Sequence, residues 1–298
     1  MRAIEKTVHA PAKINLFLSV KKRRADGYHE LESFMQKLEL ADEISVRVEE
    51  GEGIILNCPD SDLPVDDGNL AWRAARDFLE EAALNCRAMI TLKKVIPVAA
   101  GLGGGSSDAA AVLLALNDLL ETGMSEGRLE SLALRLGADV PFFVNDAPAA
   151  VARGVGERLE VVPALAECHI LLVNPDFPVS TSWVFDNFAL TSKGNPYILA
   201  PEKDYQSTIY SGSLIDTLEE AGPDVLFNDL ESVTVTRYPE IAAIKKKMVE
   251  DGAVASLMSG SGPTVFGIFT NEVAAAASCE YFRQRYGKKV VLTVPSHS

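Results

Sequence analysis

Hydrophobic and polar residues alternate along this chain with two different periods, and the change of period predicts where strands end and helices begin. Alternation in steps of two predicts a strand, a turn around Ala10–Asn15 and a second strand across residues 7–20, and another strand pair across residues 33–48. Apolar residues at helical spacing predict a helix over residues 70–84, and residues 88–95 are predicted to form the next strand. The first part of the chain is therefore rich in strands.

The rest of the chain is predicted to alternate between helices and short strands. A helix with an apolar stripe is predicted over residues 108–120, and a shorter helix over residues 129–136. Residues 191–213 form a long polar stretch, and a loop of that length usually serves a ligand or lacks order. The change of pattern predicts two domains, residues 1–158 and 159–298. The further elements predicted are strands over 168–173, 256–258, 264–269 and 289–293, and helices over 180–188, 239–250 and 273–286.

Composition and charge limit the classes of protein to which this chain can belong. With 298 residues, 47% hydrophobic and 23% charged, it is long and apolar enough for two globular domains. Its 28 basic and 42 acidic residues give a formal net charge of −14 at pH 7, which disfavours a surface for nucleic acid. Two dense basic runs, Lys21–Arg24 and Lys245–Lys247, are interpreted as a solvated turn and a helix face.

Cysteine use and hydropathy favour a reducing compartment. The four cysteines are far apart and form no CxxC pair, so neither a disulfide framework nor a zinc site is expected. No apolar run reaches the ~18 residues of a membrane span, and the amino-terminal segment lacks the apolar core of a signal peptide. We therefore expect a cytoplasmic protein that does not associate with membranes.

A glycine-rich segment, Pro97–Ala111, carries the strongest chemical signal in the chain. A residue without a Cβ atom adopts positive φ freely and lets the backbone approach an anion closely. Ser106 or Ser107 is expected to cap the following helix, whose N-terminal N–H groups and positive dipole end favour a phosphate. The spacing fits neither the dinucleotide fingerprint nor the Walker loop with its lysine, so a positive charge has to come from elsewhere. The alternative is a glycine-rich turn that leads into a buried helix and binds nothing. The glycines in question are Gly101, Gly103, Gly104 and Gly105.

Three separated segments resemble the three motifs of the GHMP family of small-molecule kinases: Pro11–Leu16, Pro97–Ser107 and Met258–Thr264. The resemblance implies an α+β fold of two domains with a nucleotide and substrate cleft between them, and it implies ATP with Mg²⁺. Because Mg²⁺ keeps several waters, no dedicated protein metal site is expected, and Ser106 or Ser107 is the protein oxygen expected nearest to the ion. The residues that the resemblance implies at the nucleotide are Asn69, Lys94, Ala99, Ala100, Gly101, Leu102, Gly103, Gly104, Gly105, Ser106 and Ser107. Asn69 and Lys94 could instead be ordinary surface residues.

The same resemblance implies that Asp139 and Lys13 are the catalytic residues. Asp139 stands between Ala138 and Val140, in an apolar stretch where an isolated charge is costly unless it is paired. Its position in the motif implies a base that accepts the proton of the substrate hydroxyl, while Lys13 supplies the cation that the glycine loop lacks. Phosphoryl transfer depends more on alignment and charge stabilisation than on full deprotonation. The alternatives are a helix cap for Asp139 and a side chain that extends to solvent for Lys13.

Further segments resemble one branch of the family, whose acceptor is a small molecule with a cytidyl diphosphate group. The branch acts in the non-mevalonate route to isoprenoid precursors and phosphorylates a 2-hydroxyl with ATP. It implies that Tyr28 stacks on the cytosine, that His29 hydrogen-bonds the edge of the base and that Phe185 closes the other face. Asn15 and Thr181 are further candidates at the acceptor, together with the catalytic aspartate. The segments that carry this narrower resemblance are Asp26–Leu31, Gly137–Phe143 and Gly154–Glu157.

Two other interpretations stay open. Another GHMP enzyme, such as a homoserine or mevalonate kinase or a diphosphomevalonate decarboxylase, shares the glycine loop but does not need the Tyr28–His29 pair. A nucleotide-binding regulator of the same fold would have lost turnover, and the presence of both Lys13 and Asp139 argues against it. The sequence leaves open whether the protein is a monomer or a homodimer, and it gives no role for Trp183.

Overall fold

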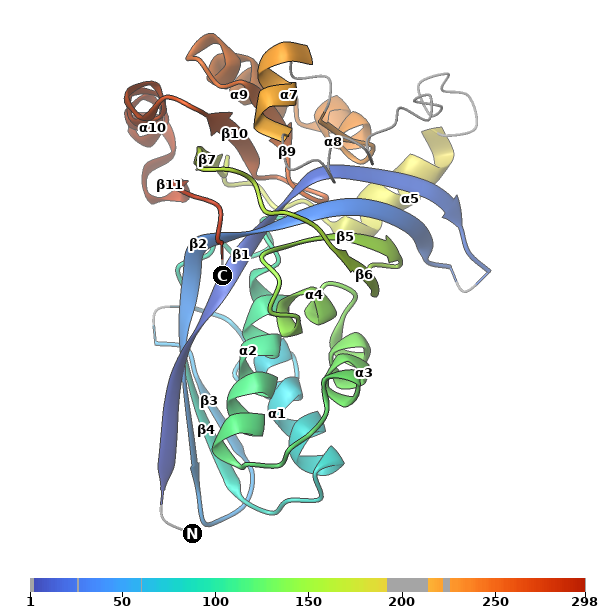
Figure 1. The fold of residues 1–298 in the computed structure, drawn as a ribbon, viewed down its shortest axis with the longest axis vertical. Coiled ribbons are helices and arrows are strands. Elements are labelled where there is room, and N and C mark those ends of the chain that lie inside the picture. Colours follow the sequence, from blue (N-terminus) through green and yellow to red (C-terminus); the bar gives the residue numbers. More distant parts are fainter. Residues whose placement is uncertain (1–2, 26, 60, 192–213, 222–225, 298) are drawn as a thin grey trace. The chain divides into compact units, whose positions relative to one another are not determined.

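The long strands β1 (Ile4–Arg23) and β2 (His29–Glu49) are the first elements of the chain in the computed structural model, which describes residues 3–25, 27–59, 61–191, 214–221 and 226–297 (Figure 1). Each is one continuous strand, so the predicted turn near Ala10–Asn15 and the predicted strand pair over residues 33–48 are wrong. Pro11 is compatible with an extended chain, and the side chains from Ala12 to Leu18 are all buried. Because successive side chains in this stretch are all buried, the sequence there does not alternate between apolar and polar residues as a strand with one exposed face would.

The chain forms two compact units, and each long strand contributes to both. Unit 1 comprises Met1–Ala12, Leu40–Val98 and Gly103–Asp146. Unit 2 comprises Lys13–Glu39, Ala99–Leu102 and Ala147–Ser298. The predicted domain boundary between residues 158 and 159 stays a prediction.

Unit 1 contains a sheet in which β3 (Ile54–Asn57) pairs with β4 (Arg87–Lys93), and β4 pairs with β2. Buried and partly exposed side chains alternate along both β2 and β4 in this region. In the antiparallel register the buried residues face one another, because Ile44 lies opposite Leu92 and Val46 opposite Ile90. The pairing therefore places the apolar residues of both strands on one face of the sheet.

The helices of unit 1 are α1 (Leu70–Glu81), α2 (Gly104–Leu119), α3 (Glu126–Leu136) and α4 (Val140–Val144), with α1 and α2 side by side (Figure 1). The predicted helices that correspond to α1 and α3 are confirmed. Helix α2 begins four residues before the predicted start, at Gly104. Gly103 is its N-cap and no side chain makes the capping hydrogen bond, so the predicted cap at Ser106 or Ser107 is wrong. Both serines lie inside the first turns of the helix instead.

Unit 2 contains a four-stranded antiparallel sheet in the order β11-β7-β10-β9. The predicted strands at these positions are confirmed. In the same unit β5 (Ala149–Gly154) pairs with β2, β6 (Arg158–Val161) pairs with β5, and the short β8 (Phe227–Asn228) runs parallel to β1. The strands of the four-stranded sheet are β7 (His169–Val173), β9 (Ala255–Met258), β10 (Val265–Phe269) and β11 (Val290–Thr293), the last preceded by the 3₁₀ turn Gly287–Lys289.

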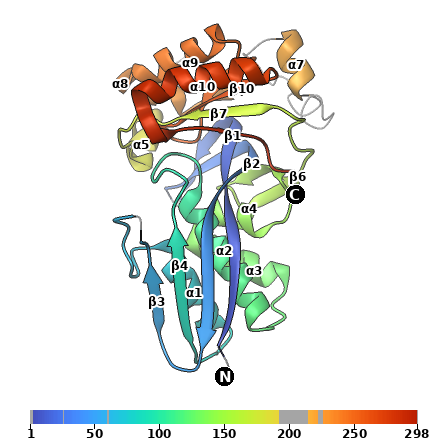
Figure 2. The ribbon, with the colours of Figure 1, turned by 90° about the vertical axis from the view of Figure 1, so that its left-hand side faces the viewer.

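Helices α9 and α10 cover one face of this sheet, as Figure 2 shows. Their apolar residues, including Ile244 and Phe282, share a core with Val173 and Phe269 of the strands. Residues 192–213 of the predicted polar loop lie outside the described residues. Within the described part of the chain, no helix combines the length and hydropathy that a membrane span requires. The helices of unit 2 are α5 (Thr181–Thr191), α7 (Leu214–Ala221), α8 (Glu231–Arg237), α9 (Glu240–Glu250) and α10 (Glu272–Tyr286).

Candidate functional site

The backbone of the glycine-rich loop has the conformation of an anion-binding turn. Positive φ values recur at every second residue, with +52° at Ala99, +77° at Gly101 and +71° at Gly103. Successive N–H groups in such alternating conformations form a concave, electropositive surface. Of the four glycines for which the sequence allowed positive φ, Gly101 and Gly103 adopt it, whereas Gly104 and Gly105 lie in the first turn of α2. Ala99 adopts positive φ without the freedom of glycine. This strained alanine agrees with a loop whose shape serves a purpose other than stability.

Gly101 is fixed by a close approach of a second loop within unit 2. A Cβ atom at Gly101 would lie 2.2 Å from the carbonyl oxygen of Ser259, which no side chain tolerates. The Ser259 hydroxyl also donates a hydrogen bond of 2.9 Å to the Gly101 carbonyl, and Thr264 N–H donates to Ala100 O at 3.3 Å. A glycine is therefore required at this position both for φ and for space.

Lys94 supplies a buried positive charge beside the other half of the loop, in unit 1. Its ammonium group pairs with Asp42 and, at 2.8 Å, with the Oδ2 atom of Asp108. A Cβ atom at Gly104 would lie 3.3 Å from Lys94 Nζ, so the cation lies next to the first residue of α2. The alternative of an ordinary surface residue is wrong for Lys94, whose side chain is 8% exposed. A lysine at a helix N-terminus is unfavourable unless carboxylates accompany it or an anion binds there.

The carboxylates of Asp42 and Asp108 were not singled out from the sequence. Asp108 directly follows Ser107, but its burial depends on the tertiary structure, and Asp42 is far from Lys94 in the chain. Burial raises the pKa of Asp108 to about 7, opposed by the Lys94 charge and reinforced by Asp42. Asp42 also accepts hydrogen bonds from the backbone N–H groups of Val95 and Ile96, which fixes the chain just before the loop.

Two buried polar atoms near the start of α2 have no hydrogen-bond partner among the described residues. They are the Ser107 hydroxyl oxygen and the Oδ1 atom of Asp108. Burying such an atom without a partner costs about 1–3 kcal/mol, which a bound polar group can recover. Together with Lys94, these atoms fit a phosphate group and the hydrated cation that accompanies it.

Asn69 lies at the beginning of α1 and is buried. Its Oδ1 atom accepts a hydrogen bond of 3.0 Å from Ala71 N–H, and its Nδ2 group donates to Pro64 O at 2.9 Å. Asn69 is thus the helix N-cap, and the interpretation as an ordinary surface residue is wrong. Its contact with the nucleotide stays a prediction.

Lys13 and Asn15 are neighbours on one face of β1 in unit 2, because alternate residues of a strand point to the same side. The Lys13 side chain is buried rather than extended to solvent, and its ammonium donates to Asn15 Oδ1 at 2.6 Å. Asn15 Nδ2 donates to Ser33 Oγ at 2.8 Å, and that hydroxyl donates to Phe17 O at 2.7 Å. The polar chain holds the amide of Asn15 and thereby directs the lysine.

Asp139 occupies the N-cap position of the five-residue helix α4, but its side chain makes no capping hydrogen bond. The alternative of a structural cap is therefore wrong. The residue is half-buried, and buried Val140 and Pro141 follow it. Asp139 belongs to unit 1 and Lys13 to unit 2, so their pairing stays a prediction.

The residues predicted to hold a pyrimidine lie in unit 2. The His29 ring stacks on Phe185, with centroids 5.0 Å apart and planes 21° from parallel, while Tyr28 is 66% exposed. The pKa of His29 is lowered, first by desolvation and then by the charge of Arg23, and its buried Nε2 atom has no partner among the described residues. Thr181 is the first residue of α5, the helix that also contains Phe185, and its Oγ1 atom lies 2.8 Å from Ser261 Oγ.

Trp183 of α5, which the sequence left without a role, belongs to an aromatic cluster in unit 2. It meets Tyr238 edge to face, and Tyr238 stacks on Phe177. The guanidinium of Arg237 lies 4.6 Å from the centre of the Trp183 ring. These contacts anchor α5 and place Trp183 in a structural role.

Comparison with known proteins identifies the class to which these features belong. The model of the GHMP kinases N terminal domain matches residues 69–147, and the model of the GHMP kinases C terminal domain matches residues 213–288. The chain belongs to the GHMP kinase family. The relatives include 4-diphosphocytidyl-2-C-methyl-D-erythritol kinase of Pelobacter propionicus, 45% identical over 91% of this chain and 92% of that protein. The kinase of the same name from Syntrophotalea carbinolica is 43% identical over 96% of this chain and 97% of that protein.

Solved structures give the same result for the fold. A crystal structure of 4-(cytidine 5'-diphospho)-2C-methyl-D-erythritol kinase superposes with a TM-score of 0.80 at 35% identity, covering 98% of this chain and 100% of that chain. A homoserine kinase from Cytophaga hutchinsonii superposes with a TM-score of 0.73 at 19% identity, covering 99% and 96%, which shows a shared fold alone. The predicted GHMP kinase fold, with N- and C-terminal domains of mixed helices and sheets, is confirmed.

Proposed function

We propose that this chain transfers the terminal phosphoryl group of ATP to the 2-hydroxyl of 4-diphosphocytidyl-2-C-methyl-D-erythritol, on the non-mevalonate route to isoprenoid precursors. The observation that carries the proposal is the kinship with kinases of that name at 43–45% identity over at least 91% of both chains. The likeness to homoserine kinase at 19% identity concerns the fold, so it gives no comparable support to the rival acceptor.

The phosphates of ATP are proposed to bind at the glycine-rich loop. Backbone N–H groups of the alternating turn and of the first turn of α2 would donate to phosphate oxygens, and Lys94 would add positive charge next to Gly104. When bound with the nucleotide, Mg²⁺ would neutralise phosphate charge, and the Ser107 hydroxyl is the protein oxygen proposed to hold it.

Asp139 is proposed to accept the proton of the 2-hydroxyl as its oxygen attacks the γ-phosphorus. The new oxygen–phosphorus bond forms while the bond to the β–γ bridging oxygen breaks, and ADP leaves. Lys13 would stabilise the negative charge on the attacking oxygen. Its hydrogen bond to Asn15 and its burial hold the ammonium in place before substrate arrives, so little reorganisation is needed in the transition state.

The cytosine ring is proposed to bind at the aromatic residues of unit 2. His29 already stacks on Phe185, and its Nε2 atom is the polar group left to meet the edge of the base. Desolvation and the charge of Arg23 lower the pKa of His29, which favours the neutral ring that can match the donor and acceptor pattern of cytosine. Exposed Tyr28 is proposed to stack on the base.

The test is ADP release with a panel of acceptors: the cytidyl diphosphate acceptor, its uridyl analogue, mevalonate, homoserine and no acceptor. We expect turnover with the cytidyl compound and a loss of at least about tenfold in kcat/KM with the uridyl analogue. The two bases differ in a donor and acceptor at the edge that would face His29, and a mismatched buried polar group costs about 1–3 kcal/mol. In His29→Ala the preference between the two should shrink.

Three outcomes would contradict the proposal. Turnover with mevalonate or homoserine in place of the cytidyl compound would assign a different acceptor. Release of ADP that no acceptor stimulates would favour a nucleotide-binding regulator. Equal use of both pyrimidines by the wild type would remove His29 from the base edge.

A further inference from the structure

The segment Met258–Thr264, called loop 258–264 below, contacts several candidate site residues of unit 2. Its Ser259 contacts Gly101 of the phosphate-binding turn through both the hydroxyl and the carbonyl. A Cβ atom at Gly260 would lie 3.3 Å from Gly101 O and 3.5 Å from Asn15 Oδ1, so the loop backbone passes directly beside both residues. Ser261 Oγ lies 2.8 Å from Thr181 Oγ1. A shift of this loop would therefore displace the surroundings of several candidate residues at once.

The loop is too short and too glycine-rich to fix its own position. Gly260 and Gly262 have φ values of +58° and +88°, and the internal hydrogen bonds run from Ser259 N–H to Thr264 O at 2.9 Å and from Gly262 N–H to Ser259 O at 3.0 Å. Glycines leave the backbone free to adopt other conformations at little cost. Contacts from outside the loop must select the observed one.

Asn228 supplies the main contact of this kind. Its Nδ2 group donates to two loop carbonyls, Met258 O at 2.8 Å and Gly260 O at 2.7 Å, while its Oδ1 atom accepts from Leu230 N–H at 3.0 Å. Both amide protons are thus used on the loop, and the third bond fixes which way the amide points. The residue is buried, so the bonds are protected from competing water.

The backbone of Asn228 is held by the strand that carries Lys13 and Asn15. Asn228 pairs with Leu18 of β1 in a parallel register, and the next residue, Asp229, donates its N–H to Leu18 O at 3.0 Å. The Asp229 side chain accepts from Val20 N–H at 2.7 Å. The side-chain amide of Asn228 therefore fixes the position of loop 258–264 relative to β1.

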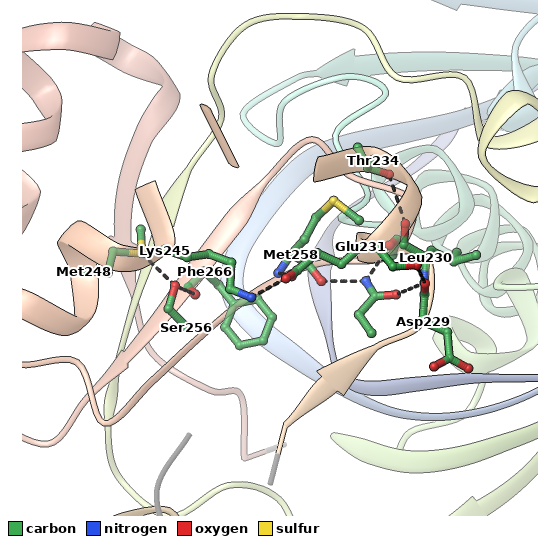
Figure 3. Close-up of polar contacts among 12 residues, drawn as sticks. Asp229, Leu230, Glu231, Thr234, Lys245, Met248, Ser256, Met258 and Phe266 are labelled. Atoms are coloured by element: carbon green, nitrogen blue, oxygen red, sulfur yellow. Dashed lines mark hydrogen bonds and ion pairs between the residues drawn. The ribbon is translucent and has the colours of Figure 1, made fainter. Parts of the chain in front are cut away.

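Glu231 makes a second contact with the loop, at its start. One carboxylate oxygen accepts from Met258 N–H at 2.9 Å, and the other pairs with the ammonium of Lys245 from α9, as Figure 3 shows. Glu231 lies in the first turn of α8, where the helix dipole favours a carboxylate. The lysine and the helix together hold Glu231 in a single orientation.

We infer that Asn228 and Glu231 are positioning residues for phosphoryl transfer, because through loop 258–264 they set the place of the Gly101 backbone and the surroundings of Asn15. Neither residue is inferred to touch substrate. The inference rests on the proposed function for the identity of the acceptor and for the binding of ATP phosphates at the glycine-rich turn.

Asn228→Asp is the decisive variant, with Gln36→Glu as its matched control. The aspartate keeps the shape of the amide but faces two carbonyls without a donor. Gln36 is another buried amide of unit 2, whose Nε2 group donates to Lys37 O and Ser296 O, both at 2.9 Å, and neither Lys37 nor Ser296 is a candidate site residue. The same chemical change at either position should lower stability to a similar degree.

In the folded protein we expect Asn228→Asp to lower kcat by about tenfold or more and to weaken binding of a non-hydrolysable ATP analogue. The reason is that a small misplacement of reacting groups can lower the rate up to ~10²-fold. Gln36→Glu should leave both within about twofold of the wild type. Glu231→Gln, which weakens the pairing with Lys245, should give a smaller loss in the same direction. It serves as the second test if Asn228→Asp does not fold.

The inference is overturned if Asn228→Asp and Glu231→Gln are folded with wild-type kcat and analogue affinity, or if Gln36→Glu loses as much as Asn228→Asp. Binding of the analogue, measured by calorimetry, does not depend on the acceptor. If the wild type phosphorylates a different acceptor, the proposed function is wrong. The kcat values of the variants and the wild type are then compared with that acceptor, and the comparison still tests the positioning role.

Discussion

At the scale of single residues, the proposed chemistry depends on polar groups that neighbouring residues already hold in place. Lys13 is directed by Asn15, which Ser33 orients, and Lys94 is enclosed by Asp42 and Asp108. Each cation is buried and hydrogen-bonded. Burial strengthens the field of such a group at a reacting atom, provided that its desolvation is offset by partners of this kind.

Asp139 can be tested directly as the catalytic base. Asp139→Asn keeps the shape of the side chain but removes its ability to take a proton, and because the aspartate makes no capping bond in α4, the fold should survive. We expect kcat to fall about 10²- to 10⁴-fold with little change in the KM of the acceptor. Steady-state kinetics measure both, and turnover within a few-fold of wild type would remove Asp139 from the mechanism.

The titration of Asp108 makes a prediction about stability. Its pKa is raised from an ordinary 3.8 to about 7 by burial, so between these values the folded protein binds a proton that the unfolded chain releases. The contribution of Asp108 to stability is therefore complete below about pH 4 and is lost as the pH rises through about 7.

Asp108→Asn, which cannot titrate, isolates this effect. Relative to the variant, the wild type should gain about 2 kcal/mol in the free energy of unfolding between pH 8 and pH 5.5, at about 1.4 kcal/mol per unit below the raised pKa. Denaturant unfolding of both proteins at the two pH values measures the difference. A difference that does not change with pH, or that grows with rising pH, would show that the folded-state pKa is not raised.

At the scale of elements, the turn proposed to bind phosphate is shaped by a second loop as much as by its own glycines. Gly101 needs positive φ, which the sequence indicates, but it also needs the space next to Ser259 O, which only the fold reveals. Helix α2 begins at Gly104 rather than after the serines, so Gly104 and Gly105 lie in its first turn, and its N-cap, Gly103, has no side chain that could cap it. The N–H groups at the start of α2 are therefore the ones proposed to donate to phosphate.

Gly101→Ala tests the turn. The added methyl group would meet Ser259 O at 2.2 Å with φ at +77°, so the backbone has to move. We expect the Kd of an ATP analogue to rise at least about tenfold, which corresponds to about 1.4 kcal/mol. Gly127→Ala in α3 is the control, because a Cβ atom there meets nothing within 4 Å and should leave affinity unchanged. Unchanged affinity in a folded Gly101→Ala would make the turn structural.

At the scale of the whole molecule, the two units divide the candidate residues between them. Unit 1 holds Asp139, Lys94 and the start of α2, and unit 2 holds Lys13, His29 and loop 258–264. Strands β1 and β2 each run through both units, and the glycine-rich segment passes from unit 1 to unit 2 after Val98 and back to unit 1 after Leu102. The units are therefore each built from several separate segments of the chain.

Local signals were sufficient for most elements and for the family. Helical spacing marked α1, α9 and α10 because each has one apolar face, and three short motifs were sufficient to place the chain among the GHMP kinases. The same signals misplaced turns in β1 and β2. Burial on both faces at residues 12–18 of β1 and 33–38 of β2 leaves no alternation there, and the neighbours that bury these residues come from distant parts of the chain.

The amino-acid order alone established where anion-binding backbone, a catalytic carboxylate and a stacking pair were to be sought, because glycine conformation, charge and aromaticity are properties of the residues themselves. Folding decided which polar groups are buried together. Asp42 and Asp108 come to enclose Lys94, and Asn228 and Glu231 come to hold loop 258–264, through contacts between segments that are far apart in the chain. Desolvation, which sets the pKa of Asp108 and the strength of these hydrogen bonds, exists only once that packing has formed.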